Sequence, residues 1–550
     1  MTRVGDHATS WLDPAVLALA AMALALVPLL VLAQGYVPPD DALRHAAKVV
    51  AGRPWSEILV LDGRAGLDLH AGWHALLGAV HAATGLQQHG LVAVAVVLGA
   101  LVVLLPPLLC VRRPESWLLA LLPAALATPW PARVLLGRPF LLSVALVLLI
   151  AFTWRRLGAA RRPWPLLGLL AVGTALCVQA HTVLSLLPLP VLCTLLARRW
   201  RVAGRLLAAL AVGVLLGALA SGAPLAFLRQ TVWVTQASVD LDLPADELVF
   251  EFRPASGDAT FLLFVAGLLL ATRPRAGGQA GEAAARGGRR AGGWRAALRD
   301  PAAVLAGVGW LLGLRVMRFW LDWGLPALLA VLARRLDAAA RAAGMGVAPD
   351  AGPRAAQRAG GRRLALAVAS ALALVAVFAG DIDQRWTQHV PRDYLDARRP
   401  AVAAWLPGAG GIVYSASMAL FYETFFALPH APWRYVLGFE PANMPPADLA
   451  VYREARLCRL VDAAFLPWAQ RLRDEDRLCL VRPGPLPPAN LGLLWRRVAG
   501  HTWIGCRPAA ALRPLRALLA WCPPPPPALA PATLPAVAAL AGIGLAEKCN

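Results

Sequence analysis

Two adjacent carboxylates, Asp40 and Asp41, follow a pair of prolines at the end of the first long apolar segment of the sequence. A carboxylate within hydrogen-bond reach of a hydroxyl can take its proton while the oxygen attacks an electrophilic carbon. The same pattern is also typical of a helix N-terminus, where one acidic residue caps the first turn and another favours the helix dipole. We therefore expect one aspartate to be catalytic and the other to cap, with Asp41 as the base and Asp40 as the cap.

Asp41, Arg44, His45 and Lys48 would share one face of a helix that begins at this pair. Such a face is either the wall of a polar site or the solvated side of a helix at the membrane interface. We expect Arg44 and His45 to contact a substrate, whereas for Lys48 the solvated face is favoured.

A second group, His70, Trp73 and His74, lies farther along the same polar stretch, residues 36–90. Histidines four apart share a helix face and can bind zinc, but a third ligand and a glutamate partner are missing here. Hydrogen bonding to a substrate and ordinary packing are the other two interpretations. Trp73 either stacks on a sugar or anchors at the membrane interface. No cofactor is assigned, and a divalent metal is left open.

The composition places this stretch in a membrane protein, because 58% of the 550 residues are hydrophobic and only 15% are charged. Backbone groups in lipid must be satisfied within their own segment, so the apolar blocks are expected to be helices. The formal charge of +21 comes mostly from arginines in short tracts between these blocks. Tracts in that position are typical of topology signals, so we do not expect a nucleic-acid partner.

About eleven membrane spans are expected, several of them shorter than the ~20 residues of a perpendicular span. They cover residues 16–32, 91–109, 117–130, 140–154, 166–180, 184–196, 206–221, 261–271, 304–314, 320–332 and 364–378. Basic clusters fall in every second connection, at residues 112–113, 155–162, 198–205, 273–299 and 334–363. By the positive-inside rule, these connections and the N-terminus face the cytoplasm. The outward-facing connections are then residues 36–90, 131–139, the turn around His181, 222–260 and 315–319.

The fold class predicted from this pattern is a polytopic α-helical membrane protein with a C-terminal soluble domain. Residues 1–379 form the membrane module, with residues 36–90 as its long first outer loop. Residues 380–550 are richer in Trp, Tyr and Pro and form a mixed α/β domain outside the cytoplasm, with a strand at residues 412–414. Closeness in sequence favours Cys458–Cys479 and Cys506–Cys522 disulfides in that domain.

Further candidate substrate-binding residues lie in the other outward-facing connections. If the substrate carries a phosphate that leaves during the reaction, arginines there would stabilise its negative charge by electrostatic attraction and by bidentate hydrogen bonds. They are Arg133, Arg138, Arg315 and Arg318, and His181 lies at a neighbouring turn.

The long fourth outer connection contains Glu247, Glu251 and Arg253. It is either a lid over the site or a solvated loop with one short amphipathic helix. Asp322 either pairs with Arg318 at helix spacing or, if unpaired within the membrane, takes part in function.

The sequence has no Walker loop, no glycine-rich dinucleotide turn after a strand and no GxSxG elbow. Those absences argue against an ATP-driven pump, a dehydrogenase and an α/β-hydrolase. What remains is a set of carboxylates, arginines and histidines at the outer face of a helical bundle, which suits a lipid-phosphate substrate.

In its layout the chain resembles the GT-C glycosyltransferases, with acidic residues after the first span, many spans and an exported C-terminal domain. The resemblance covers the whole chain, and its one motif is Asp40-Asp41. It implies an inverting transfer of a sugar from a polyprenyl-phosphate carrier, with Asp40 or Asp41 as the base or as a metal ligand. Residues 131–139 contain no Asp or Glu, which departs from the metal-dependent branch of that family.

The expected partners are a polyprenyl-phosphate-linked sugar donor, membrane lipid, and a lipid, glycan or protein acceptor at a bacterial-type inner (plasma) membrane. A non-enzymatic alternative is a carrier or flippase that binds a lipid-linked or anionic substrate with the same arginines. A third is a scaffold for envelope assembly. Transporters tend to contain internal repeats, and the sequence shows no clear repeat, which favours the transferase.

Overall fold

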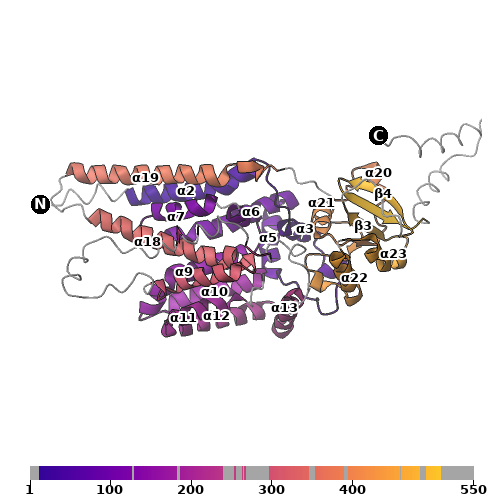
Figure 1. Cartoon of the computed structure of the whole chain (residues 1–550), viewed down its shortest axis with the longest axis horizontal. Helices are drawn as coiled ribbons and strands as arrows, with labels where there is room; N and C mark the ends of the chain where they lie inside the picture. Colours follow the sequence, from indigo (N-terminus) through magenta and orange to yellow (C-terminus); the bar gives the residue numbers. More distant parts are fainter. Residues whose placement is uncertain are drawn as a thin grey trace, which may run out of the picture.

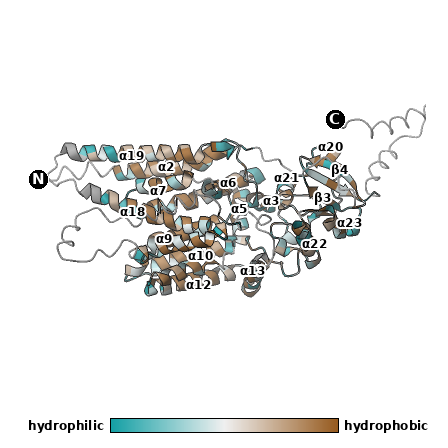
Figure 2. Cartoon of the chain, viewed as in Figure 1, coloured by the Kyte–Doolittle hydropathy of each residue, from teal (hydrophilic) through white to brown (hydrophobic). Residues whose placement is uncertain are grey.

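A computed structural model of the protein describes residues 12–126, 129–181, 186–239, 253–255, 263, 266–267, 297–345, 353–388, 394–458, 460–482 and 491–508. Most of these residues are helical, and the helices divide between a long bundle and a smaller C-terminal domain that contains a sheet (Figure 1). Hydrophobic residues dominate the bundle helices, whereas hydrophobic and hydrophilic segments mix in the C-terminal domain (Figure 2).

Six of the described helices are long and apolar enough to cross a membrane, and each falls on a predicted span. They are α2 (Leu12–Ala33), α6 (Gln88–Leu104) continued by the 3-10 turn η1 (Pro106–Leu109), α9 (Leu141–Ala159), α10 (Trp164–His181), α12 (Trp200–Ala220) and α19 (Pro353–Ala379). The other bundle helices are α7 (Glu115–Leu126), α8 (Pro129–Val134), α11 (Pro188–Leu196), α13 (Pro224–Val239), α17 (Pro301–Gly313), the π-helix η4 (Phe319–Gly324) and α18 (Leu325–Met345).

Four further predicted spans coincide with bundle elements that are not among these six. They are residues 117–130 with α7 and α8, 184–196 with α11, 304–314 with α17, and 320–332 with η4 and the start of α18. The remaining one, residues 261–271, lies largely outside the described residues. The expected count of spans therefore stays a prediction.

Small residues allow α10 and α12 to approach each other closely. A Cβ at Gly213 would lie 2.4 Å from the Cβ of Thr174, and one at Gly217 would lie 2.7 Å from Cγ1 of Val178. Carbon atoms do not come this close, so only glycine fits at these two positions one helical turn apart. Lipid provides little hydrophobic driving force between helices, and close backbone packing of this kind holds them together instead.

The predicted basic connections meet at one end of the bundle, where hydrogen bonds and ion pairs join them. The donors are arginine side chains or backbone amides, and the acceptors are carboxylates or a backbone carbonyl. The pairs are Arg112 and Arg113 with Asp337, Arg155 and Arg334 with Asp300, Arg199 with Arg299, and Arg363 with Glu115. We call these residues the basic end.

The predicted first outer loop lies at the opposite end, between the bundle and the C-terminal domain (Figure 1). It folds into α3 (Asp41–Ala51), α4 (Trp55–Ile58) and α5 (Ala71–Thr84). Gly52 ends α3 in the left-handed conformation, with φ at 63°, and its N–H donates to the carbonyl of Lys48. Which end of the bundle faces the cytoplasm stays a prediction.

The C-terminal domain contains a five-stranded sheet in the order β2-β1-β3-β5-β4. The strands are β1 (Ile412–Tyr414), β2 (Arg434–Tyr435), β3 (Arg477–Val481), β4 (Leu494–Ala499) and β5 (Thr502–Cys506). β1 pairs in parallel with β2 and β3, and β5 is antiparallel to β3 and β4. The strand predicted at residues 412–414 is confirmed as β1.

Among the described residues, two short helices precede this sheet in the chain and five more connect its strands. They are η5 (Ile382–Gln384), α20 (Pro400–Ala403), α21 (Met418–Ala427), η6 (Pro441–Asn443), α22 (Pro446–Leu457), η7 (Asp462–Phe465) and α23 (Leu466–Arg471). Together with the sheet they confirm the predicted mixture of helices and strands in this part of the chain.

The first outer loop is joined directly to the sheet. Leu59 forms a parallel bridge with Tyr435 of β2, and the N–H of Val60 donates to the Tyr435 carbonyl at 2.9 Å. The ring of Trp55 lies 4.9 Å from that of Phe439. One hydrophobic core therefore continues from the bundle into the C-terminal domain.

The predicted Cys458–Cys479 disulfide is wrong. Both thiols are free, because Cys479 is buried inside β3 whereas Cys458 is exposed at the end of α22. Closeness in sequence does not bring a strand interior and a helix end together. Cys506 is also free, and its predicted partner Cys522 lies outside the described residues.

Candidate functional site

Asp40 binds an arginine rather than the start of α3. It stands at the N-cap position, but its side chain makes no capping hydrogen bond. Arg138 holds it through two nitrogens, with Nε donating to Oδ1 at 2.9 Å and Nη2 lying 2.6 Å from Oδ2. The prediction that Asp40 caps the helix is therefore wrong, because a bidentate arginine from a distant connection replaces the backbone amides as its partner.

Asp41 lies beside the same arginine and is held by a second one. Nε of Arg44 donates to Oδ1 of Asp41 at 2.7 Å, and Nη1 of Arg138 lies 3.8 Å from Oδ2. The two aspartates thus share Arg138, with Asp40 in the closer contact. Arg44 is only 2% exposed, and its guanidinium carbon lies 3.9 Å from the centre of the Phe439 ring.

Three residues of the first outer loop form a hydrogen-bonded chain. Oδ2 of Asp68 lies 2.6 Å from Nδ1 of His74, and Nε2 of His74 lies 2.8 Å from Nδ1 of His45. An ionised Asp68 accepts from Nδ1–H of His74, so the lone pair of a neutral His74 is on Nε2. That nitrogen then accepts a hydrogen bond from Nδ1–H of His45. The lone pair at the end of the chain is then on Nε2 of His45, a buried atom with no partner among the described residues.

His70 lies against this chain and connects it to the end of α10. Its ring centre is 5.0 Å from that of His45 and 6.0 Å from that of His181. Its backbone N–H donates to Oδ1 of Asp68 at 3.0 Å. Within the described part of the chain, Nδ1 of His70 is a second buried polar atom without a hydrogen-bond partner. The structure thus brings together histidines from three separate elements.

A buried ion-pair network extends the site toward the bundle. Nε and Nη2 of Arg133 each donate to Asp322 at 2.8 Å, and both side chains are 5% exposed. Nε of Arg318 lies 3.3 Å from the same carboxylate, and Nη2 of Arg318 lies 3.3 Å from Nε2 of His181. The predicted pairing of Asp322 with Arg318 is confirmed, and Arg133 is its closer partner.

Two residues of the first outer loop differ from their predicted positions. Trp73 is buried with Leu77 in the packing of α5 against the bundle. Its ring therefore has no open face for a sugar, and its place at the membrane interface stays a prediction. Lys48, expected on a solvated face, is half-buried and donates to the carbonyl of Arg53.

Two predicted residues, Arg253 and Arg315, are not part of this cluster, and two others are not described. The side chain of Arg315 is exposed beyond the end of α17. Arg253 is exposed as well, and its carbonyl accepts the N–H of Met317 at 2.8 Å. Glu247 and Glu251 lie outside the described residues.

The C-terminal domain supplies a wall of the site that the sequence did not predict. Phe439 lies against Arg44, and its ring centre is 6.1 Å from that of His70. Helix α21 packs on α3. Tyr422 of α21 is buried, and burial followed by the nearby charge of Asp41 raises its pKa well above the usual value. The only signal for this contact was the aromatic content of residues 421–426.

Burial and charge fix the protonation states in the site. Burial tends to raise the pKa of Asp41, but Arg44 and Arg138 hold that pKa well below its ordinary range. Burial lowers the pKa of His45 far below 6.5, and burial with Arg44 lowers the pKa of His70 to about 3. Near neutral pH the carboxylate is therefore ionised and the histidines are neutral acceptors and donors.

The donor atoms of the site do not fit a metal ion. Across the described ranges, no group of three or more His, Cys, Asp or Glu side chains is arranged to hold one. Asp68 and His74 are bonded to each other, and His74 is also bonded to His45. Asp68 and His74 therefore satisfy each other, and within the described ranges the histidine nitrogens without partners do not complete a set of three ligands, so we assign no metal-dependent step to the site.

In comparisons with known proteins, no family model matches the sequence, and no curated protein matches it. The function therefore has to be inferred from the geometry of the site.

Proposed function

We propose that the protein is an inverting glycosyltransferase of the GT-C kind, which moves a sugar from a polyprenyl-phosphate carrier to a lipid, glycan or protein acceptor. In this proposal the site lies on the outer face of a bacterial-type inner membrane, and the basic end and the N-terminus lie in the cytoplasm. The C-terminal domain then lies outside the cytoplasm, above the site.

The observation that carries the proposal is a set of buried polar atoms beside an ionised carboxylate. Nη1 of Arg44, Nε2 of His45 and Nδ1 of His70 have no hydrogen-bond partner among the described residues, and Asp41 lies next to Arg44. Buried polar groups in proteins are nearly always satisfied. A bound polar ligand would satisfy this set, with the arginine nitrogen donating to a phosphate and the histidine lone pair accepting from a sugar hydroxyl.

Asp41 acts as the general base in this mechanism. It takes the proton of the acceptor hydroxyl while that oxygen forms a bond to the anomeric carbon. The bond from the anomeric carbon to the phosphate oxygen breaks, and its electron pair leaves with the polyprenyl phosphate. Attack from the face opposite the leaving group inverts the configuration at the anomeric carbon. Arg44 and Arg138 stabilise the negative charge that develops on the phosphate.

Arg138 links the base to the donor. Its bidentate contact with Asp40 is short, whereas it lies 3.8 Å from Asp41, so Asp40 orients Arg138 and Asp41 remains for proton transfer. A donor phosphate bound to Arg138 and Arg44 would draw their positive charge away from Asp41. The pKa of Asp41 would then rise, and the carboxylate would become a stronger base when the donor is bound.

Purified protein in nanodiscs, given a panel of labelled polyprenyl-phosphate sugars and lipid acceptors, tests this function. We expect a glycosylated product whose anomeric configuration is opposite to that of the donor. A product with retained configuration would contradict the single displacement. Absence of product with every donor, together with movement of the labelled lipid across liposomes, would replace the transferase with the carrier.

A further inference from the structure

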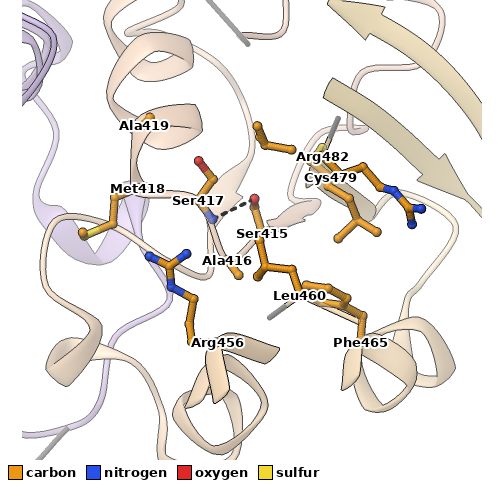
Figure 3. Close-up of a pocket in the computed structure, with 12 residues that line it drawn as sticks. Ser415, Ala416, Ser417, Met418, Ala419, Arg456, Leu460, Phe465, Cys479 and Arg482 are labelled. Carbon is orange, nitrogen blue, oxygen red and sulfur yellow. Dashed lines mark hydrogen bonds between the residues drawn. The ribbon is translucent and has the colours of Figure 1, made fainter. Parts of the chain in front are cut away.

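The C-terminal domain contains a cavity of about 300 Å³ that is separate from the cluster around Asp41. It is lined by residues 415–419 after β1, by residues 479–482 at the end of β3, and by Arg456, Leu460 and Phe465 from the other side (Figure 3). Cavities of this size accept a small molecule or one group of a larger one.

The topology of the sheet puts this cavity where parallel sheets bind ligands. From β1 the chain passes through α21 to β2 on one side, and then through α22 and α23 back across to β3 on the other side. The strand order thus reverses at β1, and the cavity lies at the carboxyl ends of β1 and β3. In open α/β sheets, ligands bind in the crevice at this point.

The turn after β1 presents polar groups to the cavity. Ser415 is 5% exposed, and its oxygen accepts the N–H of Ser417 at 3.2 Å. Its hydroxyl hydrogen has no acceptor within the described part of the chain, so a buried donor is left for a ligand. Ser417 caps α21 by accepting the N–H of Leu420, and the preceding amides of the first turn point out of the helix.

The charged residues that line the cavity are both arginines. Arg456 of α22 extends toward the turn at residues 416–418, and its guanidinium carbon lies 5.9 Å from the centre of the Tyr452 ring (Figure 3). Arg482 follows β3 and is paired with Asp462. No Asp or Glu is among the lining residues in the described ranges. A buried hydroxyl donor, helix amides and a guanidinium together favour a negatively charged ligand.

We propose that this cavity binds the phosphoryl group of a phosphate ester. Ser415 and the first-turn amides of α21 donate hydrogen bonds to the phosphate oxygens, and Arg456 supplies the charge. The ester is either a soluble sugar phosphate or the head group of a polyprenyl phosphate. This inference rests on the sheet, the cavity and its donors, and does not depend on the transferase proposal.

The test is calorimetric titration of the full-length protein in nanodiscs with glucose 1-phosphate and with uncharged glucose. We expect saturable binding of glucose 1-phosphate only. Arg456→Gln should weaken that binding by about tenfold or more, because it removes a charge-assisted hydrogen bond. Arg453→Gln, which makes the same change one turn earlier on α22 and outside the cavity lining, should leave it unchanged.

Ser415→Ala gives a second, milder probe and should weaken binding a few-fold. Nanodiscs that contain polyprenyl phosphate identify the source of the ester. If the cavity binds the lipid head group, polyprenyl phosphate will compete with glucose 1-phosphate. If the cavity binds a soluble sugar phosphate, polyprenyl phosphate will not displace glucose 1-phosphate. Equal affinity of wild type, Arg456→Gln and Ser415→Ala, no saturable binding of either ester, or equal binding of glucose would overturn the proposal.

Asp41→Asn should bind the ester normally, so that failure of the transferase and failure of this site are distinguishable.

Discussion

Both ends of the bundle are rich in aspartate and arginine, but at the basic end the aspartates also accept backbone amides. At the basic end they complete the fold. Asp300 caps α17 by accepting the N–H of Ala302 at 3.0 Å, and Asp337 accepts the backbone amides of Arg112 and Arg113. Each of these carboxylates satisfies backbone donors that would otherwise lack a partner.

At the opposite end the aspartates stand at a helix start and satisfy no backbone donor of that helix. Asp40 and Asp41 bind arginine side chains instead, and buried atoms of Arg44, His45 and His70 remain without partners in the described part of the chain. Charge alone therefore does not identify a site in this protein. At the basic end, Nη1 of Arg334 is also a buried atom without a hydrogen-bond partner in the described residues. What distinguishes the site is that several such atoms, Nη1 of Arg44, Nε2 of His45 and Nδ1 of His70, gather beside an ionised carboxylate.

The largest expected effect on stability comes from breaking the buried pair beneath the site. Asp322→Asn leaves Arg133 buried without its bidentate carboxylate, so we expect the free energy of unfolding to fall by about 3–5 kcal/mol. Thermal or denaturant unfolding in nanodiscs measures the change. Glu475→Gln, at a partly exposed position of the C-terminal domain, is the matched control. A loss as small as that of the control would show that the pair is not structural.

Arg138→Gln should lower the rate of sugar transfer by about 10²–10³-fold, because the leaving phosphate loses a charged hydrogen-bond donor. Arg138→Lys should recover part of the rate, since the charge returns without the bidentate geometry. Arg315→Gln, which removes an exposed arginine outside the cluster, is the control for net charge. Equal rates in Arg138→Gln and Arg315→Gln would remove Arg138 from the site.

The neutral histidines predict a dependence of stability on pH. An unfolded histidine gains its proton near pH 6.5, whereas burial keeps the pKa of His70 at about 3 in the fold. Between these values the unfolded chain binds more protons, so the fold loses stability as the pH falls.

In wild type the free energy of unfolding should therefore fall as the pH drops from 6.5 to 5. In His70→Asn the slope of this fall should be smaller, by up to about 1.4 kcal/mol per pH unit. Melting temperatures measured across this range test the effect, with His430→Asn at an exposed histidine as the control. Identical slopes in wild type and His70→Asn would show that His70 is not held neutral.

Asp337→Asn at the basic end should have the smallest effect. The amide oxygen can still accept from a backbone N–H, so we expect a loss of about 1 kcal/mol in unfolding free energy. The rate of transfer per folded molecule should not change. A large loss of transfer with little loss of stability would contradict the structural role of the basic end.

Local patterns in the sequence predicted much of the architecture. The six long apolar helices, the strand at residues 412–414 and the pairing of Asp322 with Arg318 each depend on neighbours within a few residues. Periodicity and helix spacing are sufficient for features of this kind. The grouping of the basic connections also follows, because charged loops of alternate connections must lie at the same end of a bundle.

Long-range pairings were beyond these patterns. Arg138 is 98 residues from Asp40, and Arg133 is 189 residues from Asp322. A Pro-Pro-Asp-Asp start favours a cap when only local partners are considered, and the distant arginine changes that outcome. The wall formed by Phe439 was missed for the same reason, since the first outer loop and the C-terminal domain are separated in sequence by the whole bundle and are brought together only in the fold.

In the proposed mechanism Asp41 is the base and Asp40 orients Arg138. The most direct measurement is the initial rate of sugar transfer by wild type, Asp41→Asn and Asp40→Asn, with Asp337→Asn as the matched substitution at the basic end. We expect Asp41→Asn to lower the rate by about 10²–10⁴-fold, Asp40→Asn to lower it less, and Asp337→Asn to leave it unchanged. Wild-type rates in both Asp41→Asn and Asp40→Asn would contradict the assignment of either aspartate to the site.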